Sequence, residues 1–326
     1  MKLGLHAYSL LLAGGLRGYQ PDKRGPLTAE QLLKKAARLK CAGVQFARQQ
    51  FAELDMVNLV NLGSRAKKLE LTVHLSTNIL SGKHLVEMIH NAHSMGAPQV
   101  TVGLSYLKGS VKDRQRTLEN LLVDLGIAIK TAERYEVMLA IENGRHTAAA
   151  DLVALIQAAE SPWVRACFDM GNALTIPEDP VNSADLLGPY CVSGHLKDVQ
   201  VYRTAGGVML VNCPIGDGVV AVTEVLRVLK RHQPEMMLFL QTAAERVSVP
   251  VLDDDFLRQY PRITARALAG LLRHGTLDYD QDARSFPNER KTSEREVLKW
   301  EEDALKRSLK QALKLMGTES LTLSLG

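Results

Sequence analysis

One rhythm repeats along roughly the first 250 residues: a short apolar run, a polar turn, and a segment with helical periodicity. Apolar runs of strand length, separated by helix-length segments, are typical of parallel strands joined by crossover helices. The runs read KLGLHAYSL, VQFA, LTVHLS, PQVTVGLSY, VMLAIEN, VRACFDMGN, CVSGHLKDV and MMLFLQTA. Eight such units predict an α/β chain closed into a (β/α)8 barrel, a fold of about 250 residues.

The main alternative, an open doubly wound sheet, lacks its usual signature, because no G-x-G-x-x-G follows the first run. The 326 residues then divide into a barrel over residues 1–275 and an extension over residues 276–326. The extension reads as a polar linker followed by a long amphipathic helix, with Ser293 and Glu296 spaced for a capping box. Its apolar stripe comprises Leu298, Leu305, Leu309, Ala312 and Met316. The stripe predicts burial either on this barrel or on a second subunit, as a homo-oligomer or a hetero-subunit pair.

Composition excludes several classes of protein. A net charge of +4 with 5% aromatic residues does not support nucleic-acid binding. No apolar stretch reaches membrane-spanning length, so we expect no membrane association. The four cysteines are Cys41, Cys167, Cys191 and Cys213, and none forms a C-x-x-C pair. We therefore expect reduced, buried thiols and a cytoplasmic location.

Polar side chains end several of the apolar runs, and the carboxyl ends of parallel barrel strands meet at one face. Glu142, Asp169 and His195 lie at three consecutive run ends, where buried carboxylates are costly unless they bind a cation. Two carboxylates and an imidazole suit a divalent metal. We expect Mn²⁺, with Mg²⁺, Co²⁺ or Zn²⁺ as alternatives.

The segments IEN, FDMGN, GHLKD and PIGDG, in this order, resemble the xylose-isomerase-like barrel superfamily of sugar isomerases, epimerases and dehydratases. The resemblance covers roughly the first 250 residues and implies that Glu142, Asp169 and His195 are metal ligands. The fourth ligand of that family is a glutamate, and here its position holds Gln241. An amide oxygen can still ligate a metal, so we expect Gln241 as the fourth ligand, with Glu245 as the alternative.

The presence of Gln241 at the position of the family's glutamate changes the chemistry that we expect. The epimerases of this superfamily use two metal-bound glutamates as an acid and a base on opposite faces of the substrate, and an amide cannot fill either role. A metal here can still stabilise an enediolate of a small carbohydrate substrate. We assign catalytic roles to Glu142, His74 and Lys197, with His6 and His146 as other candidate bases, and substrate binding to His6, Arg203 and Asn172.

Several functions stay open at this point. The first is an isomerase or epimerase of a sugar, ketose or 3-oxo sugar acid. The second is a lyase, meaning a decarboxylase or dehydratase of an oxo sugar acid, or a C-glycoside-cleaving subunit. The third is a non-catalytic barrel that binds a sugar or a partner. A three-zinc endonuclease is disfavoured, because Asn172 stands where a second-metal histidine is expected. For Lys197 and Asp198, a structural ion pair is the alternative to a role in the site.

Overall fold

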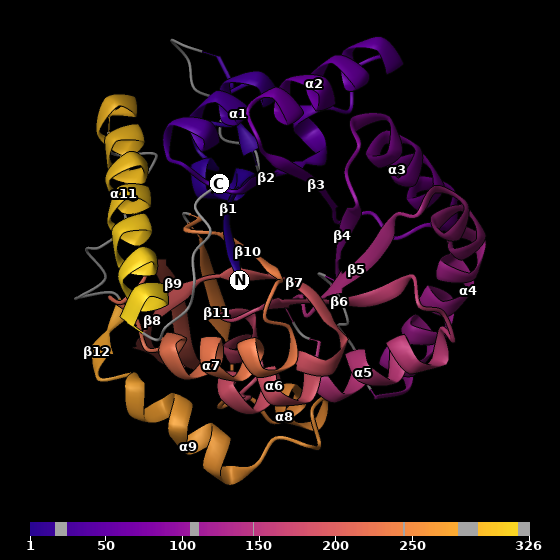
Figure 1. The fold of residues 1–326 in the computed structure, drawn as a ribbon. Coiled ribbons are helices and arrows are strands. Elements are labelled where there is room, and N and C mark those ends of the chain that lie inside the picture. The colour runs from indigo at the N-terminus through magenta and orange to yellow at the C-terminus, as the bar shows by residue number, and fades with distance from the viewer. Residues whose placement is uncertain (17–24, 105–110, 146, 244, 280–292, 319–326) are drawn as a thin grey trace.

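Eight parallel strands close into a barrel at the centre of the molecule, and helices surround them (Figure 1). The structure, a computed structural model, describes residues 1–16, 25–104, 111–145, 147–243, 245–279 and 293–318. The barrel strands are β1 (Lys2–His6), β2 (Gly43–Ala47), β3 (Thr72–Thr77), β4 (Gln99–Gly103), β5 (Met138–Glu142), β6 (Val164–Asp169), β7 (Cys191–Leu196) and β10 (Met237–Leu240). Their order around the barrel is β1-β10-β7-β6-β5-β4-β3-β2, which confirms the predicted (β/α)8 barrel.

The crossover helices follow the strands along the chain, and their ends carry the expected signals. They are α1 (Ala29–Arg38), α2 (Met56–Lys68), α3 (Gly82–Met95), α4 (Val111–Tyr135), α5 (Ala149–Ala158), α6 (Pro180–Leu187) and α7 (Val222–His232). Thr28 and Gln31 form a capping box at the start of α1, and Gly96 ends α3 in the left-handed conformation with φ of 65°. None of the helices in the described part of the chain combines the length and the apolar character that crossing a bilayer requires.

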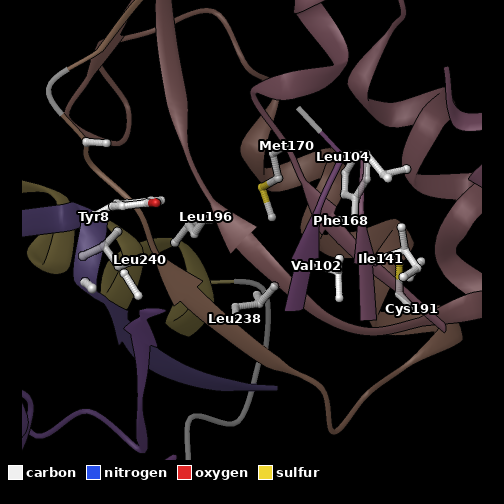
Figure 2. Packing of buried hydrophobic residues seen from close by; sticks show 14 of the residues in the cluster. Tyr8, Val102, Leu104, Ile141, Phe168, Met170, Cys191, Leu196, Leu238 and Leu240 are labelled. Atoms are coloured by element: carbon white, nitrogen blue, oxygen red, sulfur yellow. The ribbon is translucent and has the colours of Figure 1, made fainter. Parts of the chain in front are cut away.

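Side chains of opposite character alternate along the barrel strands. In β2, Val44 and Phe46 are fully buried apolar residues that flank the buried Gln45. Successive strand residues point to opposite faces, so the apolar side chains pack beneath the helices while Gln45 points into the barrel. Figure 2 shows buried apolar side chains of neighbouring strands lying together, among them Val102 and Ile141. Inside the barrel Gln45 is hydrogen-bonded to Thr101 and His195, so the interior is polar where the candidate site lies.

A second sheet, which the sequence patterns did not predict, follows β7. It contains β8 (Asp198–Thr204), β9 (Gly207–Cys213), β11 (Arg246–Val249) and β12 (Leu277–Asp278), in the order β11-β9-β8-β12. β8 and β9 form an antiparallel hairpin, and Gly207 at its turn has φ of 150°, a conformation that disfavours any side chain. The chain then continues through α8 (Asp254–Arg258) and α9 (Ala265–His274).

The C-terminal helix α11 (Glu294–Thr318) packs on its own barrel, beside the turn η1 (Ala7–Leu10) that follows β1 (Figure 1). Leu305, Ala312 and Met316 of the predicted stripe are buried, whereas Leu298 and Leu309 are partly exposed. The interface is also polar, because Glu301 accepts hydrogen bonds from the backbone N–H groups of residues 12 and 13 at 2.7 and 2.9 Å. The structure therefore shows α11 packed on its own barrel, which is one of the two surfaces that we expected to cover the stripe.

Candidate metal centre and substrate cavity

Three adjacent strands bring Glu142, Asp169 and His195 together at the carboxyl end of the barrel. Glu142 ends β5, Asp169 ends β6, and Asp169 is paired in register with His195 of β7. One ligand atom from each side chain lies within 4.8 Å of the other two. The sequence therefore predicted correctly which side chains converge, and the donor set suits a hard or borderline divalent cation.

His195 has its two ring nitrogens in different surroundings. Nδ1 lies 3.3 Å from Glu142 Oε1 and 3.7 Å from Asp169 Oδ2, whereas Nε2 lies 2.9 Å from Gln45 Oε1. The amide nitrogen of Gln45 donates to Thr101 Oγ1 at 2.6 Å, which leaves its oxygen to accept from Nε2–H. This hydrogen bond fixes the proton on Nε2, so Nδ1 is the nitrogen directed toward the carboxylates and available to a metal.

Charge in the cluster shifts the pKa values of its members in opposite directions. Burial alone would raise the pKa of Asp169, but the Lys197 ammonium, His195 and the backbone N–H of Asn172 together lower it. Burial would lower the pKa of His195, yet Cys167, Glu142 and Asp169 raise it well above its ordinary value. The raised pKa of His195 shows that its surroundings favour a positive charge at this position, and a bound cation would take the place of that charge.

Gln241 lies at the fourth corner, directly after β10. Its backbone N–H donates to the carbonyl of Leu196 at 3.0 Å, and its side chain lines the cavity above the cluster. Gln241 Oε1 is buried, and no described residue gives it a hydrogen-bond partner. A buried acceptor in this position is suited to a ligand outside the protein, such as a cation. The alternative ligand Glu245 instead binds Arg145, with 2.8 Å between Nη2 and Oε2.

Lys197 and Asn172 form a bridge between the two carboxylates of the cluster. Lys197 Nζ lies 3.4 Å from Asp169 Oδ2 and 3.1 Å from Asn172 Oδ1, and Asn172 Nδ2 donates to Glu142 Oε1 at 3.1 Å. Asn143 holds Asp169 from below, accepting from its N–H at 2.6 Å and donating to its carbonyl at 3.0 Å. Lys197 and Asn172 both line the cavity, so each can also reach a bound molecule.

Asp198 does not pair with Lys197, so the alternative of an ion pair between these neighbours is wrong. Its carboxylate instead accepts four backbone N–H groups, from Val199, Gly216, Gly218 and Val220, at 2.9 to 3.1 Å. Burial raises its pKa to about 6, although these four hydrogen bonds lower it. A Cβ at Gly218 would lie 2.1 Å from Asp198 Oδ1, so only glycine lets the turn close this tightly. The PIGDG segment is therefore an anchored turn.

The predicted histidines separate into two environments. His6 lines the cavity, accepts the Tyr8 N–H at Nδ1 (2.9 Å), and its ring centroid lies 4.9 Å from that of His195. His74 is buried against Phe239, outside the residues that line the cavity, with 4.8 Å between their ring centroids. Burial, together with the charge of His195, lowers its pKa to about 3. His74 is therefore a neutral core residue, and the structure does not bring it to the cavity as the catalytic group we expected.

Two further candidates lie away from the observed site. Arg203 is exposed on β8 and is not among the residues that line the cavity, so the structure does not place it to bind substrate as we expected. His146 lies outside the described residues. The sequence patterns did not predict Gln45 as the partner of His195, nor the pairing of Arg145 with Glu245. Gln45 carries a readable signal, because a polar residue between two buried strand residues points into the barrel.

The cavity above the cluster has a volume of about 560 Å³, which suits a small molecule such as a sugar. His6, Glu142, Lys197 and Gln241 line its floor, and Arg246 and its neighbours in β11 add a wall from the second sheet. The four cysteines of the chain are buried and free of disulfides, as the sequence predicted, and Cys167 Sγ lies 3.7 Å from His195 Nε2.

Comparisons with known proteins give consistent relatives. A family model described as a xylose isomerase-like TIM barrel matches residues 33–251. An uncharacterised Escherichia coli protein, YihM, is 23% identical over 218 residues, which are 67% of this chain and 65% of that protein. The 3-oxo-isoapionate decarboxylase of Pectobacterium atrosepticum is 24% identical over 221 residues, 67% of this chain and 77% of that protein.

Among solved structures, an L-ribulose 3-epimerase is similar with a TM-score of 0.60 at 13% identity, over 99% of this chain and 98% of that chain. At this identity the likeness supports the fold alone. The match to YihM spans just under two thirds of that protein's length.

Proposed function

Because the chain belongs to the xylose isomerase-like TIM barrel family, we propose that it is a divalent-metal-dependent enzyme that acts on a small oxo sugar or oxo sugar acid. The observation that carries the proposal is the convergence of Glu142, Asp169 and His195 beneath a cavity of sugar size. The enzymes among the relatives, a decarboxylase and an epimerase by name, are consistent with carbohydrate chemistry.

Four side chains of this chain would hold the metal: Glu142, Asp169, His195 through Nδ1, and Gln241 through its buried oxygen. Two charged carboxylates, an imidazole and an amide leave the cation with less neutralising charge than a set with three carboxylates. When bound, the cation would supply Lewis-acid stabilisation to negative charge that develops on a substrate carbonyl oxygen. The Gln45 hydrogen bond would keep His195 in the ligating tautomer.

Glu142 is the residue we assign to proton transfer. Its side chain lines the cavity and is 14% exposed, and the Asn172 amide holds Oε1 in place at 3.1 Å. It would take the proton beside the substrate carbonyl, or return a proton to carbon after a carboxyl group has left. Lys197, at the same wall, would donate hydrogen bonds to a substrate oxygen.

Gln241, as the proposed fourth metal ligand, favours chemistry with a single carboxylate base. Gln241 cannot exchange a proton at neutral pH, and the other carboxylate that lines the described part of the cavity, Glu245, is ion-paired with Arg145. Epimerisation with two glutamates therefore lacks its second partner. Decarboxylation, dehydration and one-base isomerisation each need one base and a stabilised oxyanion, and we place a lyase reaction first among them.

A substrate screen tests the proposal. Ketoses, inososes and 3-oxo sugar acids are incubated with the Mn²⁺-loaded protein in D₂O and followed by NMR. We expect turnover that leaves one deuterium on carbon, and loss of that turnover in Glu142→Gln at saturating Mn²⁺, whereas the exposed control Glu224→Gln keeps it. Release of water or carbon dioxide identifies a lyase, and unchanged composition identifies an isomerase. Metal binding without turnover or exchange on any compound would overturn the proposal and favour a non-catalytic sugar-binding barrel.

A further inference from the structure

An ion pair spans the mouth of the barrel. Arg145 lies in the loop between β5 and α5, Glu245 lies between β10 and β11, and Nη2 of the first is 2.8 Å from Oε2 of the second. β5 and β10 are not neighbours, because β6 and β7 lie between them in the barrel. Both side chains line the cavity above the candidate metal centre, and Glu245 is 6% exposed. The pair therefore crosses the space that a substrate would enter.

The described residues around this cavity would carry a net positive charge once a divalent metal is bound. Among the described residues that line it, three are basic, namely Arg145, Lys197 and Arg246, and two are acidic, namely Glu142 and Glu245. Asp169, which contacts the ammonium of Lys197, adds the third negative charge. The charges of these six side chains sum to zero, so a bound divalent cation, with His195 as a neutral ligand and Gln241 uncharged, would give the described site a net charge of about +2. A cavity with excess positive charge favours an anionic occupant over a neutral one.

We propose that the substrate carries an oxyanion, a carboxylate or a phosphate, which binds the guanidinium of Arg145 in competition with Glu245. This inference rests on the proposed function, since it names the substrate class of the same cavity. The planar guanidinium matches such groups with two parallel hydrogen bonds. In the structure a carboxylate, that of Glu245, already binds Arg145, so the position accepts an oxyanion of this shape. A neutral sugar has no group that competes with Glu245.

Binding of three four-carbon probes to the Mn²⁺-loaded protein tests the inference by calorimetry: erythronate, erythritol 4-phosphate and neutral erythritol. We expect Arg145→Gln to weaken binding of an anionic probe at least tenfold. We expect Glu245→Gln to tighten the same probe several-fold, because it removes the competing carboxylate. Erythritol affinity should change less than about twofold in both variants. The control Arg203→Gln removes an equal charge outside the cavity lining and should leave all three affinities unchanged.

The opposite directions of the two variants keep the test decisive even if one of them folds poorly. A response confined to erythronate identifies a carboxylate substrate, and a response confined to the phosphate probe identifies a phosphorylated one. Any of three results would overturn the inference. The first is an equal effect of Arg145→Gln and Arg203→Gln on anion binding. The second is weaker anion binding by Glu245→Gln at saturating metal, and the third is a wild-type protein that prefers neither anion over erythritol. These measurements need no turnover, so they fail independently of the proposed reaction.

Discussion

Replacing Gln241 with glutamate restores a charged ligand to the fourth corner and should tighten metal binding. A unit charge about 4 Å from a cation, at an effective dielectric constant of about 20, contributes about 4 kcal/mol for each positive charge. Two effects reduce this gain. The Gln241 oxygen already offers a dipole, and a buried glutamate beside Glu142 and Asp169 would take up a proton that the metal must displace. We expect a net gain of about 2 kcal/mol, or roughly thirtyfold in affinity.

Calorimetric titration with Mn²⁺ measures this change directly. The matched control is Gln49→Glu, which adds the same charge to an exposed residue that lines the same cavity but lies outside the ligand set. Without metal, Gln241→Glu should lower the melting temperature, because a third carboxylate then faces the other two. Equal Mn²⁺ affinity in Gln241→Glu and wild type, or equal tightening in both variants, would refute the assignment of Gln241 as a ligand.

Three further changes test the supports around the site. Gln45→Leu should weaken Mn²⁺ binding about tenfold, and nitrogen NMR of the Zn²⁺-loaded protein should lose the single Nε2–H tautomer of the histidine ligand; an unchanged tautomer would contradict this role. Burial raises the pKa of Glu301 to about 7, above the ordinary value of 4.5. Between these two pH values the folded protein holds a proton on Glu301 that the unfolded chain has released. The free energy of unfolding should therefore fall by roughly 3 kcal/mol as pH rises from about 4.5 to 7. Glu301→Gln should flatten that decline in thermal melts, and a parallel decline would refute it. Gly218→Ala should destabilise the protein by about 3 kcal/mol in urea, whereas Gly126→Ala, with open space around its Cβ, should stabilise it slightly.

The barrel could be predicted because its signal is local. Each apolar run and each amphipathic helix is legible within about fifteen residues, and eight repetitions specify closure. The surface against which α11 packs could not be predicted, because an apolar stripe indicates which residues of a helix are buried but not which surface covers them. The hairpin of β8 and β9 was not predicted, although the sequence contains a Gly206-Gly207 turn between two apolar runs, because short apolar runs without strict alternation do not distinguish a strand from a buried helix segment.

The candidate site could be predicted in part for a similar reason. Glu142 and Asp169 end their strands, and the ends of parallel strands meet at one face. The height of each side chain along the barrel axis, and hence whether it reaches the cavity, could not be predicted. His6 and His74 are both strand histidines on either side of Gln45 in register, yet only His6 reaches the cavity, because tilted, staggered strands place hydrogen-bonded partners at different heights.

The ion pair across the mouth was also beyond prediction from sequence. Its members lie 100 residues apart in loops, whose closure in space leaves no periodic signal. The same holds for the position of Arg203, which we expected to bind substrate and which lies exposed on β8, outside the residues that line the cavity.

Anomalous diffraction from crystals grown with Mn²⁺ tests the central claim most directly, because it locates the ion without assuming a substrate. We predict a single strong peak bounded by Glu142, Asp169, His195 Nδ1 and Gln241 Oε1. Asp169→Asn should abolish the peak while the barrel stays folded. A wild-type crystal with stoichiometric Mn²⁺ located elsewhere, or with the Lys197 ammonium seated among these side chains and no ion, would contradict the proposed metal centre.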